Sequence, residues 1–194
     1  MDISPDDVWK QLFINLSRHL DTKITHSGTH STHVAYWVKV IARKLDIPKD
    51  DVQIIFWASL LHDIGKISIP DDILAKNGPL TDEEWILMKM HPIVGANMVN
   101  SLHSLSQTAQ VIQAHQEKYD GTGYPKGLKG DEIPLGARIL AVADAYVAMT
   151  NERVYRTACS HSEAINELKA KKGQQFDPAI VDSFIEVINS YPYQ

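Results

Sequence analysis

Six residues of this chain combine metal-binding side chains with strongly apolar neighbours. Asp144, for example, lies within RILAVADAYVAM, where an ionised carboxylate without a partner would cost several kcal/mol. Six nitrogen and oxygen ligands without a thiolate suit two divalent first-row ions held close together, and such donors fit iron, manganese, nickel or zinc better than calcium or magnesium. Asp63 has two carboxylate oxygens and can bridge the ions. The six residues are His33, His62, Asp63, His91, His115 and Asp144.

Each of these residues also has a purely structural interpretation. A single histidine on a helix is more often packed or solvated than bound to metal, and a buried aspartate more often caps a helix or pairs with a base. The adjacent pair His62 and Asp63, which follows an apolar run and precedes Lys66, is harder to explain by packing alone. Five other histidines lie in polar or loop-like stretches and are interpreted as solvated: His19, His26, His30, His103 and His161.

Composition narrows the class of protein. The chain has 194 residues, 44% of them hydrophobic, which fits one globular domain with a substantial core. No apolar run approaches membrane-spanning length, and the first residues, MDISPDDVWK, lack a signal-peptide profile. Cys159 is the only cysteine, so we expect no internal disulfide and a reducing, cytoplasmic location. A net charge of −5 predicts no general attraction to DNA or RNA.

Apolar spacing and helix-terminal residues predict that these ligands sit on an all-helical bundle. The first helix is expected over residues 4–20, where Val8, Leu12, Leu16 and Leu20 recur every four positions, and a Ser/Thr/Gly-rich loop is expected over 21–32. Gly65 is expected to end an apolar helix over 50–64 in a left-handed conformation. Further helices are expected over 33–45, 81–90, 93–101, 105–118, 135–150, 161–172 and 177–190.

Residues 120–134, DGTGYPKGLKGDEIP, form the one long irregular stretch. A loop of this length in a compact domain is usually functional or disordered, and a short hairpin within it is the one place where strands are expected. We expect the loop to border the metal site. Tyr124 either packs on a bound base or pins the loop to the domain, and Lys126 and Lys129 either attract an anionic ligand or are simply solvated.

Several motifs resemble, in order, the HD-GYP family of the HD-domain superfamily of metal-dependent phosphohydrolases. They are LLHDIGKISIPDDIL, HPIVGANMV, HQEKYDGTGYPKGLKGDEIPLGARILAVADAY and ERVYR. The resemblance covers roughly residues 30–185. We therefore expect an N-terminal helix and linker over residues 1–29 and an HD-GYP domain over 30–194.

The resemblance implies a phosphodiesterase that opens the bacterial second messenger cyclic di-GMP to linear pGpG or to GMP, through a metal-bridging hydroxide at a binuclear site. One ion would be bound by His33, His62, Asp63 and Asp144, and the other by Asp63, His91 and His115. Asp63 and Lys66 would be the catalytic residues. The substrate would be contacted by Lys66, Tyr124, Arg153 and Arg156.

Three positions depart from the family pattern. Gln116 replaces a second histidine, and Thr29 stands where many members have a glutamate four positions before the first histidine. In other members, that second histidine and that glutamate help to hold a third ion, so two metals are expected here. Val147 replaces a common aspartate, which bears on how the substrate-facing arginines are held. The alternatives are a catalytically weak cyclic-dinucleotide-binding signalling module, or a phosphohydrolase of another cyclic nucleotide. Protein partners in bacterial signalling and the oligomeric state stay open.

Overall fold

The computed structural model describes residues 5–25, 28–151 and 158–190. Within these ranges the chain forms helices and loops, and its only β-type pairing is a single bridge between Lys172 and Phe176, which confirms the predicted all-helical fold. The α-helices are α1 (Pro5–Thr25), α2 (His30–Lys44), α3 (Lys49–Leu61), α4 (Asp71–Leu74), α5 (Asp82–Met88), α6 (His91–Asn100), α7 (Ser106–Ala114), α8 (Leu135–Thr150), α9 (His161–Ala170) and α10 (Pro178–Ser190). Three short 3-10 helices are η1 (Ile64–Ser68), η2 (His103–Leu105) and η3 (Gly130–Glu132).

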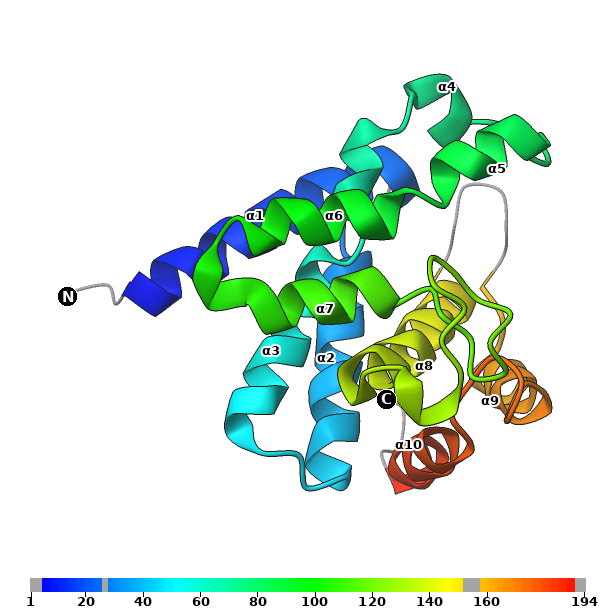
Figure 1. Ribbon diagram of the computed structural model, residues 1–194. Helices are drawn as coiled ribbons and strands as arrows, with labels where there is room; N and C mark the ends of the chain where they lie inside the picture. Colours follow the sequence, from blue (N-terminus) through cyan, green and yellow to red (C-terminus); the bar gives the residue numbers. More distant parts are fainter. Residues whose placement is uncertain (1–4, 26–27, 152–157, 191–194) are drawn as a thin grey trace.

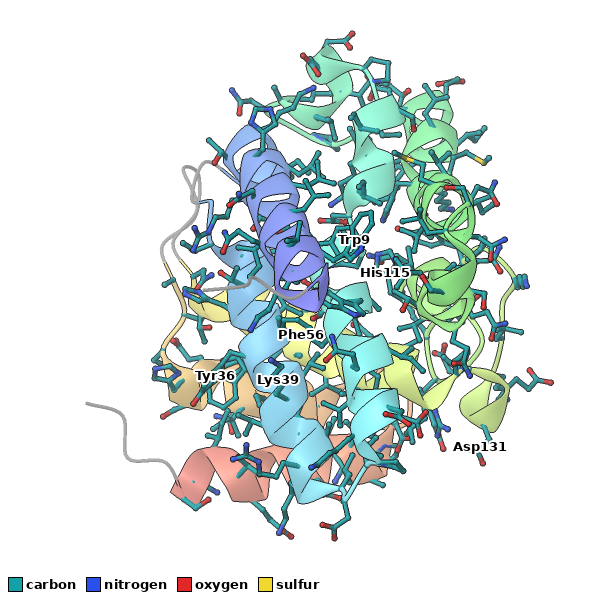
Figure 2. All side chains as sticks on the ribbon, turned by 90° about the vertical axis from the view of Figure 1, so that its left-hand side faces the viewer. Trp9, Tyr36, Lys39, Phe56, His115 and Asp131 are labelled. Atoms are coloured by element: carbon teal, nitrogen blue, oxygen red, sulfur yellow. The ribbon has the colours of Figure 1, made fainter. Side chains whose placement is uncertain are left out.

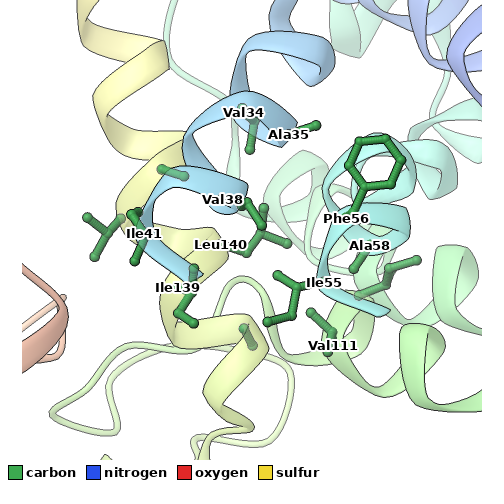
Figure 3. Packing of buried hydrophobic residues seen from close by; sticks show 14 of the residues in the cluster. Val34, Ala35, Val38, Ile41, Ile55, Phe56, Ala58, Val111, Ile139 and Leu140 are labelled. Atoms are coloured by element: carbon green, nitrogen blue, oxygen red, sulfur yellow. The ribbon is translucent and has the colours of Figure 1, made fainter. Parts of the chain in front are cut away.

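The core lies where α2, α3 and α8 meet. Figure 3 shows Val38 of α2 close to Leu140 of α8, Val34 further along α2, and Ile55 of α3 next to Val111 of α7. All five side chains are buried, and burying a side chain of this size contributes about 1.5–3 kcal/mol. In Figure 1 the α6–α7 pair lies on one side of this core, α9 and α10 lie on the other, and α4 and α5 form the upper edge. No helix in the described ranges combines the length and apolar character needed to cross a membrane.

The connection between α1 and α2 is shorter than the sequence predicts. α1 continues to Thr25 instead of ending at Leu20, and α2 begins at His30 instead of His33. The predicted apolar stripe of α1 is also wrong in part, because Val8 and Leu12 are 54% and 50% exposed while Phe13 and Leu20 are buried. At 3.6 residues per turn, a spacing of four drifts about 40° around the helix at each step, so the first members of the stripe leave the core face.

Gly65 has a different role from the one predicted. α3 ends at Leu61, and Gly65 lies inside η1 without a left-handed conformation. A Cβ at Gly65 would overlap the backbone oxygen of His91 and lie 2.6 Å from the backbone nitrogen of Gly95. Gly65 is therefore needed because η1 and α6 pack backbone to backbone, which brings Lys66 and His91 to the same place.

The loop between α7 and α8 is ordered by a buried carboxylate. Glu117 accepts hydrogen bonds from the backbone nitrogens of Lys126 and Leu128, at 2.7 and 3.1 Å. The Tyr124 nitrogen donates to the Gln116 oxygen at 3.2 Å, and a Cβ at Gly123 would overlap the backbone of Glu117. The expected hairpin does not form, since residues 120–134 contain only the short helix η3.

Candidate metal centre

Six ligand-type side chains meet in the interior as two groups of three. One group contains His30, His62 and Asp144, and the other contains Asp63, His91 and His115. Within each group the ligand atoms lie within 4.8 Å of one another. Figure 2 shows His115 inside the molecule, between the cyan α3–η1 segment and the green α6–α7 pair.

Helix ends supply most of these side chains. His62 is the C-terminal cap of α3, His91 is the first residue of α6, and His115 is the C-terminal cap of α7. Asp144 lies in the middle of α8, in a stretch of the helix where Ala143 and Tyr146 are buried. Segments far apart in the sequence therefore place imidazole and carboxylate groups around one point.

The tautomers of three histidines are fixed by backbone oxygens three residues earlier in the chain. The Nδ1 atoms of His62, His91 and His115 lie 2.9, 2.7 and 2.6 Å from the backbone oxygens of Ser59, Met88 and Ile112. A carbonyl oxygen can only accept, so each Nδ1 carries the proton and donates it. Each Nε2 therefore presents a lone pair to the centre, which is the arrangement that orients metal-bound histidines.

The contact between His91 and His115 favours a bound cation at this position. Their Nε2 atoms lie 3.3 Å apart, and both are acceptors in the tautomer that their backbone partners require. Burial lowers the pKa of His91 to about 4 and that of His115 to about 3, so neither ring takes up a proton at neutral pH. Two facing lone pairs repel each other in a buried site, and a metal ion that both nitrogens bind removes this repulsion. The donor set fits a divalent transition metal.

The two aspartates are ionised in this interior. Burial alone would raise the pKa of Asp63, but the Lys66 ammonium beside it holds the pKa well below its usual range. Burial would likewise raise the pKa of Asp144, but the hydrogen bond from His30 lowers it below the ordinary value. His30 Nε2 lies 2.9 Å from Asp144 Oδ1, and this contact outweighs burial and raises the pKa of His30. The proton between His30 Nε2 and Asp144 Oδ1 thus lies between two potential ligand atoms, and a metal ion can bind these atoms in its place.

Asp63 faces both groups. Its Oδ2 lies 3.6 Å from His62 Nε2, and its Oδ1 lies 3.7 Å from His91 Nε2. Oδ2 also accepts a hydrogen bond from Lys66 Nζ at 2.8 Å. The carboxylate therefore spans the space between the two histidine sets, as a bridging ligand must.

The structure corrects the expected ligand His33. His33 is exposed on α2, with its Nδ1 3.2 Å from Asn151 Nδ2, and it belongs to neither group. His30, predicted to be solvated, is 5% exposed and takes that place. The prediction failed because residues 21–32 looked like loop, whereas α2 starts at His30. The sequence did contain one signal for His30. Val34, Val38 and Ile41 define the buried face of α2, and the preceding position on that face, one turn before Val34, is residue 30.

Replacing His33 by His30 as the first histidine also changes which residue is compared with the glutamate that many family members have four positions earlier. The residue four places before His30 is His26, which lies outside the described residues, so Thr29 no longer carries that argument. Arg153 and Arg156 also lie outside the described residues. The Tyr124 ring lies beside the centre, 6.4 Å from the His91 ring, and Lys89 Nζ lies 5.9 Å from the Tyr124 ring centre. Sequence reasoning missed Lys89, whose neighbour Met88 orients His91.

Comparisons with known proteins identify the family of this chain. A family model described as an HD domain matches residues 15–180. A probable cyclic di-GMP phosphodiesterase of Vibrio cholerae is 38% identical over 181 residues, which cover 85% of this chain and 41% of the relative. The cyclic di-GMP phosphodiesterase PA4108 of Pseudomonas aeruginosa is 39% identical over 174 residues, covering 89% and 42%. The 3′3′-cGAMP-specific phosphodiesterase 2 of V. cholerae is 37% identical over 179 residues, covering 91% and 34%. The chain thus spans less than half the length of these relatives.

Solved structures share the fold. A cyclic GMP-AMP specific phosphodiesterase of V. cholerae aligns with a TM-score of 0.72 at 22% identity, over 92% of this chain and 48% of the other. The HD domain of the Listeria monocytogenes phosphodiesterase PgpH, in complex with cyclic di-AMP, aligns with a TM-score of 0.62 at 17% identity, over 94% and 97%. With the family model covering most of its length, this chain belongs to the HD-domain family, which confirms the resemblance to HD-domain proteins that its motifs predict.

Proposed function

We propose that this protein is a metal-dependent phosphodiesterase that hydrolyses a cyclic dinucleotide, with cyclic di-GMP as its first substrate and linear pGpG or GMP as product. The observation that carries the proposal is the 3.3 Å approach of the His91 and His115 Nε2 atoms beside Asp63, whose carboxylate faces both ligand groups. The relatives named above act on cyclic di-GMP or 3′3′-cGAMP, and their similarity over this chain supports the same substrate class.

The proposed metal ligands follow the two groups. One ion would be held by His30, His62 and Asp144, and the other by His91 and His115. Asp63 would contribute to both sites. Iron or manganese is proposed first, with zinc or nickel as alternatives, because the donors are imidazole and carboxylate without thiolate. When bound, such ions lower the pKa of a coordinated water and offset the charge of a phosphate.

The remaining roles belong to the chain's own side chains. Lys66 is held 2.8 Å from Asp63 Oδ2, at the edge of the centre, where its ammonium can donate to the non-bridging oxygens of a phosphodiester. Burial raises the pKa of the Tyr124 phenol to about 12, so Tyr124 stays neutral and can pack against a base or donate a hydrogen bond. Lys89, beside Tyr124, adds a positive charge on the same side of the site. Arg153 and Arg156 stay predicted substrate contacts.

A second candidate is a binding module of low turnover. Val147 favours it, because this residue is 1% exposed within the hydrophobic core and offers no charge to hold an arginine. The decisive experiment uses protein purified without oxygen, loaded with iron or manganese, and incubated with cyclic di-GMP, 3′3′-cGAMP and cyclic di-AMP in parallel. Linear product from one of them supports the enzyme. Tight binding of all three without any linear product eliminates it and leaves the binding module.

A further inference from the structure

The helix that carries His30 lacks a cap of its own. Thr29, the N-terminal cap residue of α2, makes no side-chain hydrogen bond to the helix, and the first turn contains no acidic residue. The first backbone N–H groups of a helix have no partner inside it, and leaving them unsatisfied next to a buried site is costly. A side chain from another element can supply a partner.

Asp21 of α1 supplies that partner. Its carboxylate is 2% exposed, Oδ2 accepts a hydrogen bond from the Ser31 backbone nitrogen at 2.8 Å, and Oδ1 accepts one from the Ser31 hydroxyl at 2.8 Å. Each of the two oxygens thus accepts a hydrogen bond from Ser31. Hydrogen bonds to an ionised carboxylate are roughly twice as strong as neutral ones, and a negative charge at a helix N-terminus is further stabilised by the helix dipole.

Ser31 follows His30 directly, so this contact sets where the His30 ring enters the centre. His30 is 5% exposed, and its Nε2 lies 2.9 Å from Asp144 Oδ1. We propose that Asp21 is a positioning residue for the metal centre: by fixing the first turn of α2 it holds His30 in the group with His62 and Asp144, and it thereby couples α1 to the occupancy of that group. This inference rests on the proposed metal centre.

A neighbouring residue separates positioning from general support of the helix packing. Ser17 lies one turn before Asp21 on α1 and is 1% exposed, yet its hydroxyl donates to the Ile14 oxygen within α1, at 3.0 Å. Ser17→Ala therefore removes a buried polar group from the same side of α1 without touching a bond to α2. Asp21→Asn keeps the shape of the side chain but removes the charge and one strong acceptor.

The test measures manganese binding to the full chain by titration, with the number of ions per chain counted by elemental analysis. Asp21→Asn should weaken one of two binding steps by about 10-fold or more, the usual cost of losing a group that orients a ligand, and leave the other step unchanged. Ser17→Ala should leave both unchanged. In a His30→Gln background, Asp21→Asn should have no further effect on metal binding, because the ligand that it orients is already gone.

Hydrogen exchange of the metal-free protein gives an independent readout. The amides at the start of α2 should exchange faster in Asp21→Asn than in the wild type, and Ser17→Ala should not change them. Should Asp21→Asn fail to fold, Ser31→Ala serves in its place, since it removes the hydroxyl bond alone and should weaken the same step to a smaller extent. Two ions bound with wild-type affinity in Asp21→Asn, or in Ser31→Ala where it serves in its place, would overturn the positioning role while leaving the proposed function intact. A wild-type chain that binds no metal would count against the proposed function itself.

Discussion

The Nε2 atoms of His91 and His115 lie 3.3 Å apart, although both are acceptors and neither ring is protonated at neutral pH. α6 and α7 pack side by side, so this distance is set by helix packing. Without a cation the contact is unfavourable, because two lone pairs face each other in a buried site. The same pair of rings makes the metal-free protein sensitive to acid.

We expect the metal-free protein to lose stability between pH 6.5 and about 4. In the unfolded chain both histidines take up a proton near pH 6.5, whereas in the folded protein burial lowers their pKa to about 4 for His91 and about 3 for His115. Their contribution is complete above pH 6.5 and falls as protons bind preferentially to the unfolded state. At about 1.4 kcal/mol for each pKa unit, the free energy of unfolding should fall by a few kcal/mol.

Urea unfolding in the presence of a chelator, at pH 7, 6, 5 and 4.5, measures this change. His115→Gln removes one of the two groups and should give a flatter dependence on pH. His33→Gln is the matched control, because His33 is exposed, and it should follow the wild-type curve. A wild-type free energy that stays constant from pH 7 to 4.5 would contradict the assignment of neutral, buried rings.

His30 and His33 lie on the same helix, α2, so substituting each in turn compares a proposed ligand with a histidine outside the centre. His30 lies in the centre with Asp144, and His33, three residues later, is exposed. His30→Gln should lose one of two ions, or bind it about 10-fold more weakly or worse, and should lose phosphodiesterase activity with it. His33→Gln should keep both ions and its activity. Elemental analysis and the product assay decide the matter, and the reverse pattern would restore His33 as the ligand.

Lys66 should affect turnover without supporting metal binding. Its ammonium lies 2.8 Å from Asp63 Oδ2 and so competes with a cation for that carboxylate. Lys66→Ala is therefore expected to bind metal as tightly as the wild type or more tightly, while kcat falls about 100-fold because a donor to the phosphate is lost. Lys169→Ala, on the exposed face of α9, is the control and should change neither quantity. Metal loss in Lys66→Ala would mean that Lys66 acts structurally.

Much of this fold and site follows from local patterns in the sequence. The capping box of Thr81 and Glu84 is formed at α5, and five of the six predicted ligands come together as expected. The capping box is a local pattern, and the five ligand-type residues lie in or directly beside apolar stretches, where a polar side chain needs a partner.

The failures lie where structure depends on contacts between distant segments. His30 was missed because its helix start is stabilised by Asp21 of α1 and not by a cap in its own sequence. The path of the loop over residues 120–134 depends on Glu117, which binds two backbone nitrogens that no periodicity reveals. The role of Gly65 depends on how closely α6 approaches η1.

That approach gives a last prediction, on the two facing glycines of η1 and α6. Gly65→Ala should destabilise the protein by about 3 kcal/mol or more, because the added methyl group overlaps the backbone of His91 and lies 2.6 Å from the nitrogen of Gly95, and backbone cannot move aside as a side chain can. Separating η1 from α6 should also move Asp63, which directly precedes η1, away from His91 and weaken metal binding at the His91 group.

Gly95→Ala is the matched control across the same contact. Its methyl group would meet the nitrogen of Gly65 at 3.1 Å and the side chains of Ile64 and Ile112 at 3.3 and 3.4 Å, so shifts of a few tenths of an ångström suffice. Alanine also favours a helix interior over glycine by about 1 kcal/mol, which offsets the crowding. Gly95→Ala should therefore unfold within about 1 kcal/mol of the wild type in urea. Equal losses in the two variants would show that the contact yields equally from either side, and that η1 is not fixed to α6 by its backbone.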